Sequence, residues 1–155
     1  RTVPAMKDGD VTMIESVAMM IYIMAKHGPT ELEVRPDEWG YGDYLQYLMF
    51  GEAGLAAYGN PLVGTRFMAP DDQKENWTAG YLKKAMLKRL EFVGERLAGK
   101  PYVAADRFTA ADISVAYIAN GARYAGIDKD IPAPVMRYIE NLWQRPAYQR
   151  AAAVK

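Results

Sequence analysis

The sequence predicts a mainly α-helical protein that opens with a short β-hairpin. Of its 155 residues, 50% are apolar, which is enough to bury one sizeable core. Asp8-Gly9 stands between two short β-type runs, and this dipeptide is typical of a tight hairpin turn. After residue 36, apolar residues recur at three- and four-residue steps, which is the spacing of amphipathic helices. We therefore expect a small α/β segment followed by an all-helical domain.

The initial segment contains two predicted strands and one predicted helix. Residues 2–6 and 11–13 are the strands, and the Ala-, Met- and Ile-rich residues 15–26 form the helix. Gly28-Pro29 ends this helix, because Gly is common just beyond a helix and Pro cannot continue one. Two strands and a helix do not form a stable domain alone, so this segment should dock on other structure.

The domain division follows these breaks in the pattern. Residues 1–28 form the initial segment, residues 29–36 a linker, and residues 37–155 the helical domain. Within that domain, helices are predicted over residues 37–58, 71–97, 109–125 and 132–144, with a short one after Pro146. No internal repeat divides the helical domain further.

Capping residues and helix breakers set the expected helix ends. Asp37 can cap the first helix of this domain, and Asp71 or Asp72 the second. Gly59-Asn60-Pro61 should interrupt the first helix, since Pro removes a helix hydrogen bond. The core-facing candidates at helical spacing are Tyr44, Leu45, Leu48 and Leu55 in the first helix and Leu82, Met86, Leu90, Val93 and Leu97 in the second.

The start of the helix at 109–125 carries the strongest structural signal. Thr109 can accept hydrogen bonds from the free amides of the first turn, and Asp112 can reach back to the Thr109 amide. We predict that Thr109 and Asp112 form a structural cap, each interaction contributing about 1 kcal/mol or less.

Composition narrows the function classes. Lys plus Arg equal Asp plus Glu, at 19 each, without the basic stripe typical of a nucleic-acid binder. The absence of cysteine excludes disulfides and thiolate metal sites, and it fits a reducing, cytoplasmic location. The longest apolar run, residues 17–25, is too short to span a bilayer. We expect no metal site, no nucleic-acid partner and no membrane association.

Motifs at both ends of the chain resemble soluble glutathione transferases of bacterial type. Val3-Pro4 and Glu15-Ser16 are similar to the pairs with which this family holds glutathione. Further on, Gly99-Lys100-Pro101-Tyr102, the capped helix at Thr109 and Arg145-Pro146-Ala147-Tyr148 resemble the C-terminal helical domain of the family, in the same order. The resemblance covers the whole chain.

The resemblance implies the domain context of the chain. The helical domain would be the C-terminal domain of a glutathione transferase, preceded by the β-hairpin and helix that end a thioredoxin-like domain. The first part of that thioredoxin-like domain would precede residue 1. It carries the Tyr, Ser or Cys that stabilises the glutathione thiolate in the family, so no catalytic residue is expected in this chain.

The resemblance also assigns a glutathione site. The backbone of Val3 would bind the cysteinyl part of glutathione, next to a cis Pro4, and Glu15 and Ser16 would hold the γ-glutamyl end. Ser16 would stand at a helix N-terminus, where free amides favour a carboxylate. Gln46 of a partner subunit would reach the γ-glutamyl amine. Taken without the resemblance, Glu15-Ser16 is better explained as an ordinary helix start, since acidic and hydroxyl residues are preferred there.

A second-substrate pocket is expected between the two domains, with Met49, Phe50, Ala53 and Tyr58 as candidate lining residues. Each of these side chains could equally belong to the core. The implied partners are glutathione, as co-substrate, an electrophilic small molecule and a second copy of the chain in a homodimer.

Three functions fit these motifs. The first is conjugation of the glutathione thiolate to an electrophile by the intact protein. The second is a non-catalytic binding or assembly module on the same scaffold, because a fold does not determine a function. The third is another glutathione-dependent enzyme, namely an isomerase, a dehalogenase or an ether-cleaving enzyme. The presence of both Val3-Pro4 and Glu15-Ser16 argues mildly against the non-catalytic module.

Overall fold

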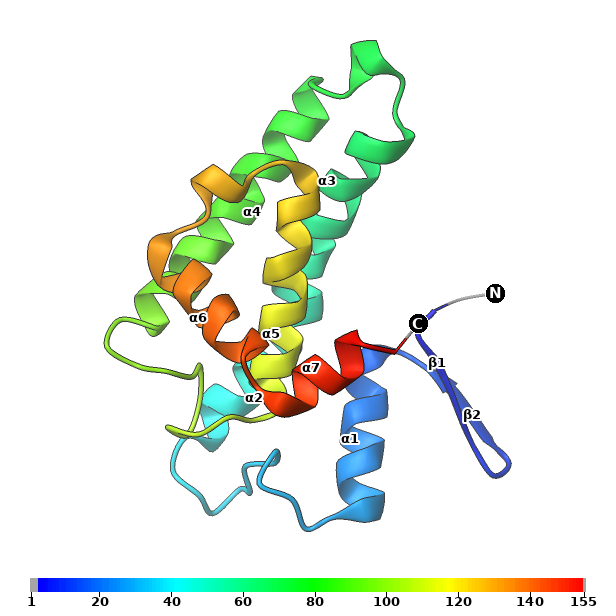
Figure 1. The fold of residues 1–155 in the computed structure, drawn as a ribbon, viewed down its shortest axis with the longest axis vertical. Helices are drawn as coiled ribbons and strands as arrows, with labels where there is room; N and C mark the ends of the chain where they lie inside the picture. The colour runs from blue at the N-terminus through cyan, green and yellow to red at the C-terminus, as the bar shows by residue number, and fades with distance from the viewer. Residues whose placement is uncertain (1–2, 155) are drawn as a thin grey trace.

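The computed structural model describes residues 3–154 as a β-hairpin, a helix and a helical bundle (Figure 1). Arg1, Thr2 and Lys155, which fall within the predicted domain limits, lie outside the described residues. The elements are β1 (Ala5–Asp8), β2 (Val11–Ile14), α1 (Ser16–His27), α2 (Tyr41–Met49), α3 (Ala57–Met68), α4 (Trp77–Arg96), α5 (Ala110–Gly121), α6 (Ala133–Trp143) and α7 (Pro146–Ala152). The predicted mainly helical fold is confirmed, while the exact domain limits stay a prediction.

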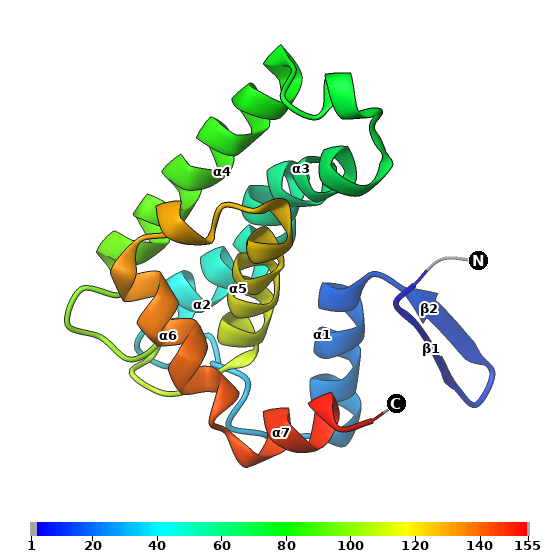
Figure 2. The same ribbon diagram turned by 45° about the horizontal axis from the view of Figure 1, so that its top comes forward.

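The hairpin forms as its turn signal indicates. β1 and β2 pair antiparallel, with Ala5 opposite Ile14 and Asp8 opposite Val11. Gly9 has a φ of 58°, a left-handed conformation that glycine adopts without strain. Figures 1 and 2 show the hairpin standing apart from the bundle, with α1 between them. In both views α7 lies beside α1, so the end of the chain returns to the initial segment.

Helix α5 forms the centre of the bundle, with α2 and α3 on one side and α6 on another (Figures 1 and 2). Its inward positions are mostly small, and Ala110, Ala111, Val115 and Ala119 are all fully buried. Small side chains let neighbouring helices approach α5 closely. None of the helices within residues 3–154 is both long and apolar enough to cross a bilayer.

The first long helix of the bundle differs from the prediction at both ends. It begins at Tyr41 after Gly40, whose φ is 85°, and Asp37 pairs with Arg35 instead of capping it. A Cβ at Gly40 would lie 3.0 Å from the Ala105 Cα, so only glycine fits this entry.

This helix also continues past its expected breaker. A π-helix, η1 (Phe50–Ala56), joins α2 to α3, and Pro61 lies inside α3. The proline removes one backbone donor, but burial of neighbours such as Leu62, which is 1% exposed, outweighs that loss. Tyr44, Leu48 and Leu55 are buried as predicted, whereas Leu45 is 40% exposed. The expectation that Leu45 faces the core was wrong.

Helix α4 has a different cap from the one expected. Asp71 and Asp72 belong to a 3-10 turn, η2 (Asp71–Gln73), and Asn76 is the capping residue. The Asn76 side-chain oxygen accepts a hydrogen bond from the Ala79 amide at 2.9 Å. The predicted core stripe of α4 is confirmed, since these residues are all buried: Leu82, Met86, Leu90, Val93 and Leu97.

The predicted capping box at Thr109 and Asp112 is present. The Asp112 carboxylate accepts hydrogen bonds from the Thr109 amide at 2.8 Å, the Val103 amide at 3.0 Å and the Tyr138 hydroxyl at 2.9 Å. Burial raises the pKa of the Asp112 carboxyl, while these donors act in the opposite direction. Asp112 therefore joins the loop before α5 and helix α6 to the helix that it caps.

Candidate functional site

The N-terminus of α1 brings two of the predicted glutathione-binding residues together. Glu15 precedes the helix with a φ of 77°, in the left-handed region that residues other than glycine seldom adopt. Ser16 follows as the first residue of α1, with its amide at the positive end of the helix. Strained backbone of this kind is often kept at functional sites, and here it falls at a residue predicted to bind ligand.

A carboxylate from the helical domain faces this helix start. The Ser16 hydroxyl donates a hydrogen bond to Glu52 Oε1 at 2.8 Å, across 36 positions of sequence. Both side chains are half-buried, and Glu52 lies in the π-helix η1. The π-helix, a form often found at functional sites, thus places an acidic group against the helix N-terminus. Sequence reasoning missed Glu52 because no local motif marks it.

The Val3-Pro4 pair has the predicted local geometry. The peptide bond between the two residues is cis, which confirms that expectation. The Val3 side chain is 87% exposed, just before β1. The role of its backbone in binding glutathione stays a prediction.

Gln46 lies on an exposed position of α2, one turn before the π-helix. An exposed side chain there is available to a second copy of the chain. Its proposed contact across a dimer stays a prediction.

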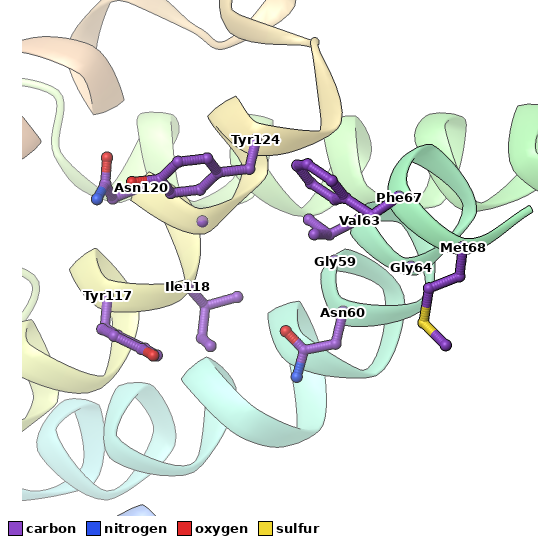
Figure 3. A pocket seen from close by; sticks show the side chains of 11 residues that line it. Gly59, Asn60, Val63, Gly64, Phe67, Met68, Tyr117, Ile118, Asn120 and Tyr124 are labelled. Carbon is purple, nitrogen blue, oxygen red and sulfur yellow. The ribbon is translucent and has the colours of Figure 1, made fainter. Parts of the chain in front are cut away.

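A cavity of about 590 Å³ lies between α3 and the end of α5 (Figure 3). Its lining residues are Gly59, Asn60, Val63, Gly64, Phe67 and Met68 of α3, and Tyr117, Ile118, Asn120, Gly121 and Tyr124 at and beyond the end of α5. None of these residues carries a charge. The cavity therefore suits an uncharged, largely apolar molecule, with amide and hydroxyl groups to orient it.

The four predicted second-substrate residues lie outside this cavity. The Phe50 ring packs on Tyr47 and Phe92, and the Arg89 guanidinium lies 3.7 Å from the centre of the Tyr58 ring. Met49 and Ala53 are exposed. The assignment of Met49, Phe50, Ala53 and Tyr58 to a substrate stays a prediction. The cavity itself begins one residue beyond Tyr58, and only the packing of α3 against α5 reveals it.

Comparisons with known proteins agree on one family. The family profile "Glutathione S-transferase, C-terminal domain" matches residues 51–146. The chain is 25% identical over 165 aligned positions to glutathione S-transferase 3 of Schizosaccharomyces pombe, covering 96% of this chain. It is 24% identical to an uncharacterised glutathione-transferase-like protein of Streptococcus mutans, covering 93% of this chain.

A solved structure shows the same fold. Ure2p5 from Phanerochaete chrysosporium, cocrystallised with 1-(S-glutathionyl)-2,4-dinitrobenzene, is 26% identical with a TM-score of 0.76. The match covers 92% of this chain and 68% of that one. The chain spans 66% and 56% of the lengths of the two curated relatives.

Proposed function

Because the chain belongs to the glutathione transferase family, we propose that the intact protein conjugates glutathione to electrophilic small molecules. The observation that carries this proposal is made at the N-terminus of α1. There Glu15 has a strained backbone, and the next residue, Ser16, donates a hydrogen bond to Glu52. Support for the ligand comes from the relative Ure2p5, which was solved with a glutathione conjugate. A homodimer and a cytoplasmic location belong to the same proposal.

The α1 N-terminus complements both charges of the γ-glutamyl end of glutathione. The ligand carboxylate would accept from the Ser16 amide and hydroxyl at the positive end of the helix. The ligand ammonium, attached to the same carbon, would donate to the Glu52 carboxylate, which now accepts from Ser16. Val3 would hold the cysteinyl part through its backbone.

The reaction itself is a nucleophilic attack by the glutathione thiolate. A carbon–sulfur bond forms at the electrophilic carbon, and either a leaving group departs with its electron pair or a conjugated double bond takes up the pair and then a proton. We place the electrophile in the uncharged cavity between α3 and α5. The group that stabilises the thiolate is proposed to lie in the part of the thioredoxin-like domain that this chain does not contain.

Replacing Glu52 by glutamine in the intact protein is expected to weaken glutathione binding about tenfold, because the ammonium loses a charged acceptor. The same substitution should leave unchanged the binding of glutaryl-cysteinylglycine, which lacks the amino group of glutathione. Isothermal titration calorimetry of both ligands measures this difference.

The matched control is Glu140→Gln, which removes an exposed carboxylate from α6. If Glu52→Gln weakens both ligands equally, Glu52 does not bind the ammonium. If the intact wild-type protein binds neither ligand, the glutathione site itself is rejected. Mass spectrometry of a reaction with 1-chloro-2,4-dinitrobenzene then tests conjugation, and binding without conjugate would indicate a non-catalytic module.

Replacing Gly64 by leucine should fill the cavity without straining the fold. Nothing lies within 4 Å of a Cβ at Gly64, and Gly is unfavourable inside a helix. We expect the KM of an apolar electrophile to rise about tenfold, from the lost burial of a few methylene-sized groups. The KM of glutathione should stay unchanged in steady-state assays.

Gly80→Leu is the control for this substitution, because Gly80 is also a helical glycine whose Cβ position has nothing within 4 Å. It lies on α4 and does not line the cavity. Equal effects of Gly64→Leu and Gly80→Leu on the electrophile would remove the cavity from the proposed site.

A further inference from the structure

A second cavity lies next to the first and has a different chemical character. It measures about 580 Å³ and is lined by the end of α5, the turns that follow it, and the junction of α6 and α7. Unlike the first cavity, its lining includes charged residues, Arg123 and Asp128, beside the aromatic residues Trp143 and Tyr148. Nothing in the function proposed above uses these side chains.

The aromatic residues and Arg123 form a continuous stack. The Arg123 guanidinium lies 5.1 Å from the centre of the Trp143 ring. The Trp143 and Tyr148 rings are stacked, with centres 6.3 Å apart and planes inclined by 25°. Such a surface favours a flat aromatic group, which can add to the stack, together with a negative charge next to the guanidinium.

The ion pair between Arg123 and Asp128 is long. Its Nε lies 3.7 Å from Asp128 Oδ1, which is beyond hydrogen-bond distance, and both side chains are partly exposed. A ligand carboxylate could form the shorter, two-pronged contact that a guanidinium prefers. Asp128 would compete with that ligand for the same cation.

The two cavities share a wall. Asn120 and Tyr124 line both of them, and Figure 3 shows the two side chains together at one end of the first cavity. Tyr124 is 66% exposed, so its ring is free to turn aside. A single elongated ligand could then extend from the uncharged cavity across this wall to Arg123.

We propose that the two cavities form one bipartite electrophile site, which selects elongated aromatic compounds with an anionic group at the end remote from the reacting carbon. The reacting, apolar end occupies the cavity between α3 and α5. The aromatic tail lies against Trp143 and Tyr148, and its carboxylate or sulfonate pairs with Arg123. This inference rests on the proposed function, and it names the substrate class of the same site.

The test measures binding of biphenyl-4-carboxylate and of the uncharged biphenyl-4-carboxamide to the intact protein by calorimetry, without glutathione. Arg123→Gln should weaken binding of the carboxylate about tenfold, through the loss of one charge-assisted contact. Asp128→Asn should tighten it, because a competing anion is removed. Neither substitution should change binding of the carboxamide, and Gly64→Leu should weaken both compounds.

Lys129→Gln is the matched control, since Lys129 is an exposed cation next to Asp128 that does not line the cavity. If Arg123→Gln and Lys129→Gln weaken the carboxylate equally, the attraction is unspecific and the inference is overturned. If Gly64→Leu leaves the binding of both compounds unchanged, the ligand does not extend into the first cavity, and the inference is likewise overturned. Failure of glutathione conjugation would reject the proposed function, whereas these binding results do not depend on glutathione.

Discussion

Replacing Gly51 by alanine is expected to destabilise the protein by about 3 kcal/mol, at the upper end of the cost of overpacking a core. A Cβ at Gly51 would lie 2.6 Å from the carbonyl oxygen of Ser114 and 2.7 Å from its carbonyl carbon. These are backbone atoms of the central helix α5, so they cannot turn aside as a side chain would. Urea unfolding of the intact protein measures the loss.

The predicted loss of stability is opposite to the effect that helix propensity alone would give. Alanine is favoured over glycine in a helix by about 1 kcal/mol, so a protein without the close approach would gain stability. Gly80→Ala provides that comparison, because a Cβ at Gly80 meets nothing within 4 Å. A Gly51→Ala protein as stable as Gly80→Ala would mean that η1 and α5 do not pack as closely as described.

Gly51→Ala should also weaken glutathione binding. Gly51 immediately precedes Glu52 in the π-helix, and its close approach to Ser114 sets the position of that helix on α5. The Ser114 hydroxyl also donates a hydrogen bond to the Leu48 carbonyl at 2.8 Å. A shift of η1 away from α5 would move Glu52 relative to Ser16. Weaker glutathione binding is therefore expected wherever Gly51→Ala still folds.

Replacing Asp112 by alanine is expected to cost about 3 kcal/mol or more, because buried donors would be left without an acceptor. The Thr109 amide, the Val103 amide and the Tyr138 hydroxyl all donate to this one carboxylate. Tyr138→Phe removes only one of these donors and leaves no buried polar group on residue 138. It should cost about 1 kcal/mol in the same unfolding experiment.

The stability that Asp112 contributes should depend on pH, and the direction of its pKa shift gives the sign of that dependence. Burial raises the pKa of Asp112 above the ordinary value of 3.8, so the folded protein holds this proton more tightly than the unfolded chain. The part of its contribution to stability that depends on this proton is therefore fully present below pH 3.8 and is lost as the pH rises through the raised pKa, so Asp112→Ala should cost more at acid than at neutral pH. An Asp112→Ala protein no less stable than Tyr138→Phe would contradict the central role of the carboxylate.

Short-range signals of the sequence predicted several parts of this structure correctly. Asp8-Gly9 indicated the hairpin, and Thr109 with Asp112 indicated the capped start of α5, because each signal acts through hydrogen bonds or backbone conformation within a few residues. The apolar spacing of α4 predicted its buried face for the same reason, since one helix surface repeats every three to four residues. Motifs of this range also sufficed to identify the family.

Tertiary packing decided the features on which function depends. Helix α2 starts after Gly40 and not at Asp37, because Ala105 lies against Gly40. Helix α3 continues through Pro61, because residues next to this proline are buried. Glu52 meets Ser16 only in the tertiary structure, where the π-helix brings its carboxylate to the start of α1 across 36 positions of sequence. The sequence by itself determined the hairpin, the capping box of α5, the buried face of α4 and the family. The close approaches and cavities were decided by the tertiary structure, because they depend on which faces meet across long separations in the chain.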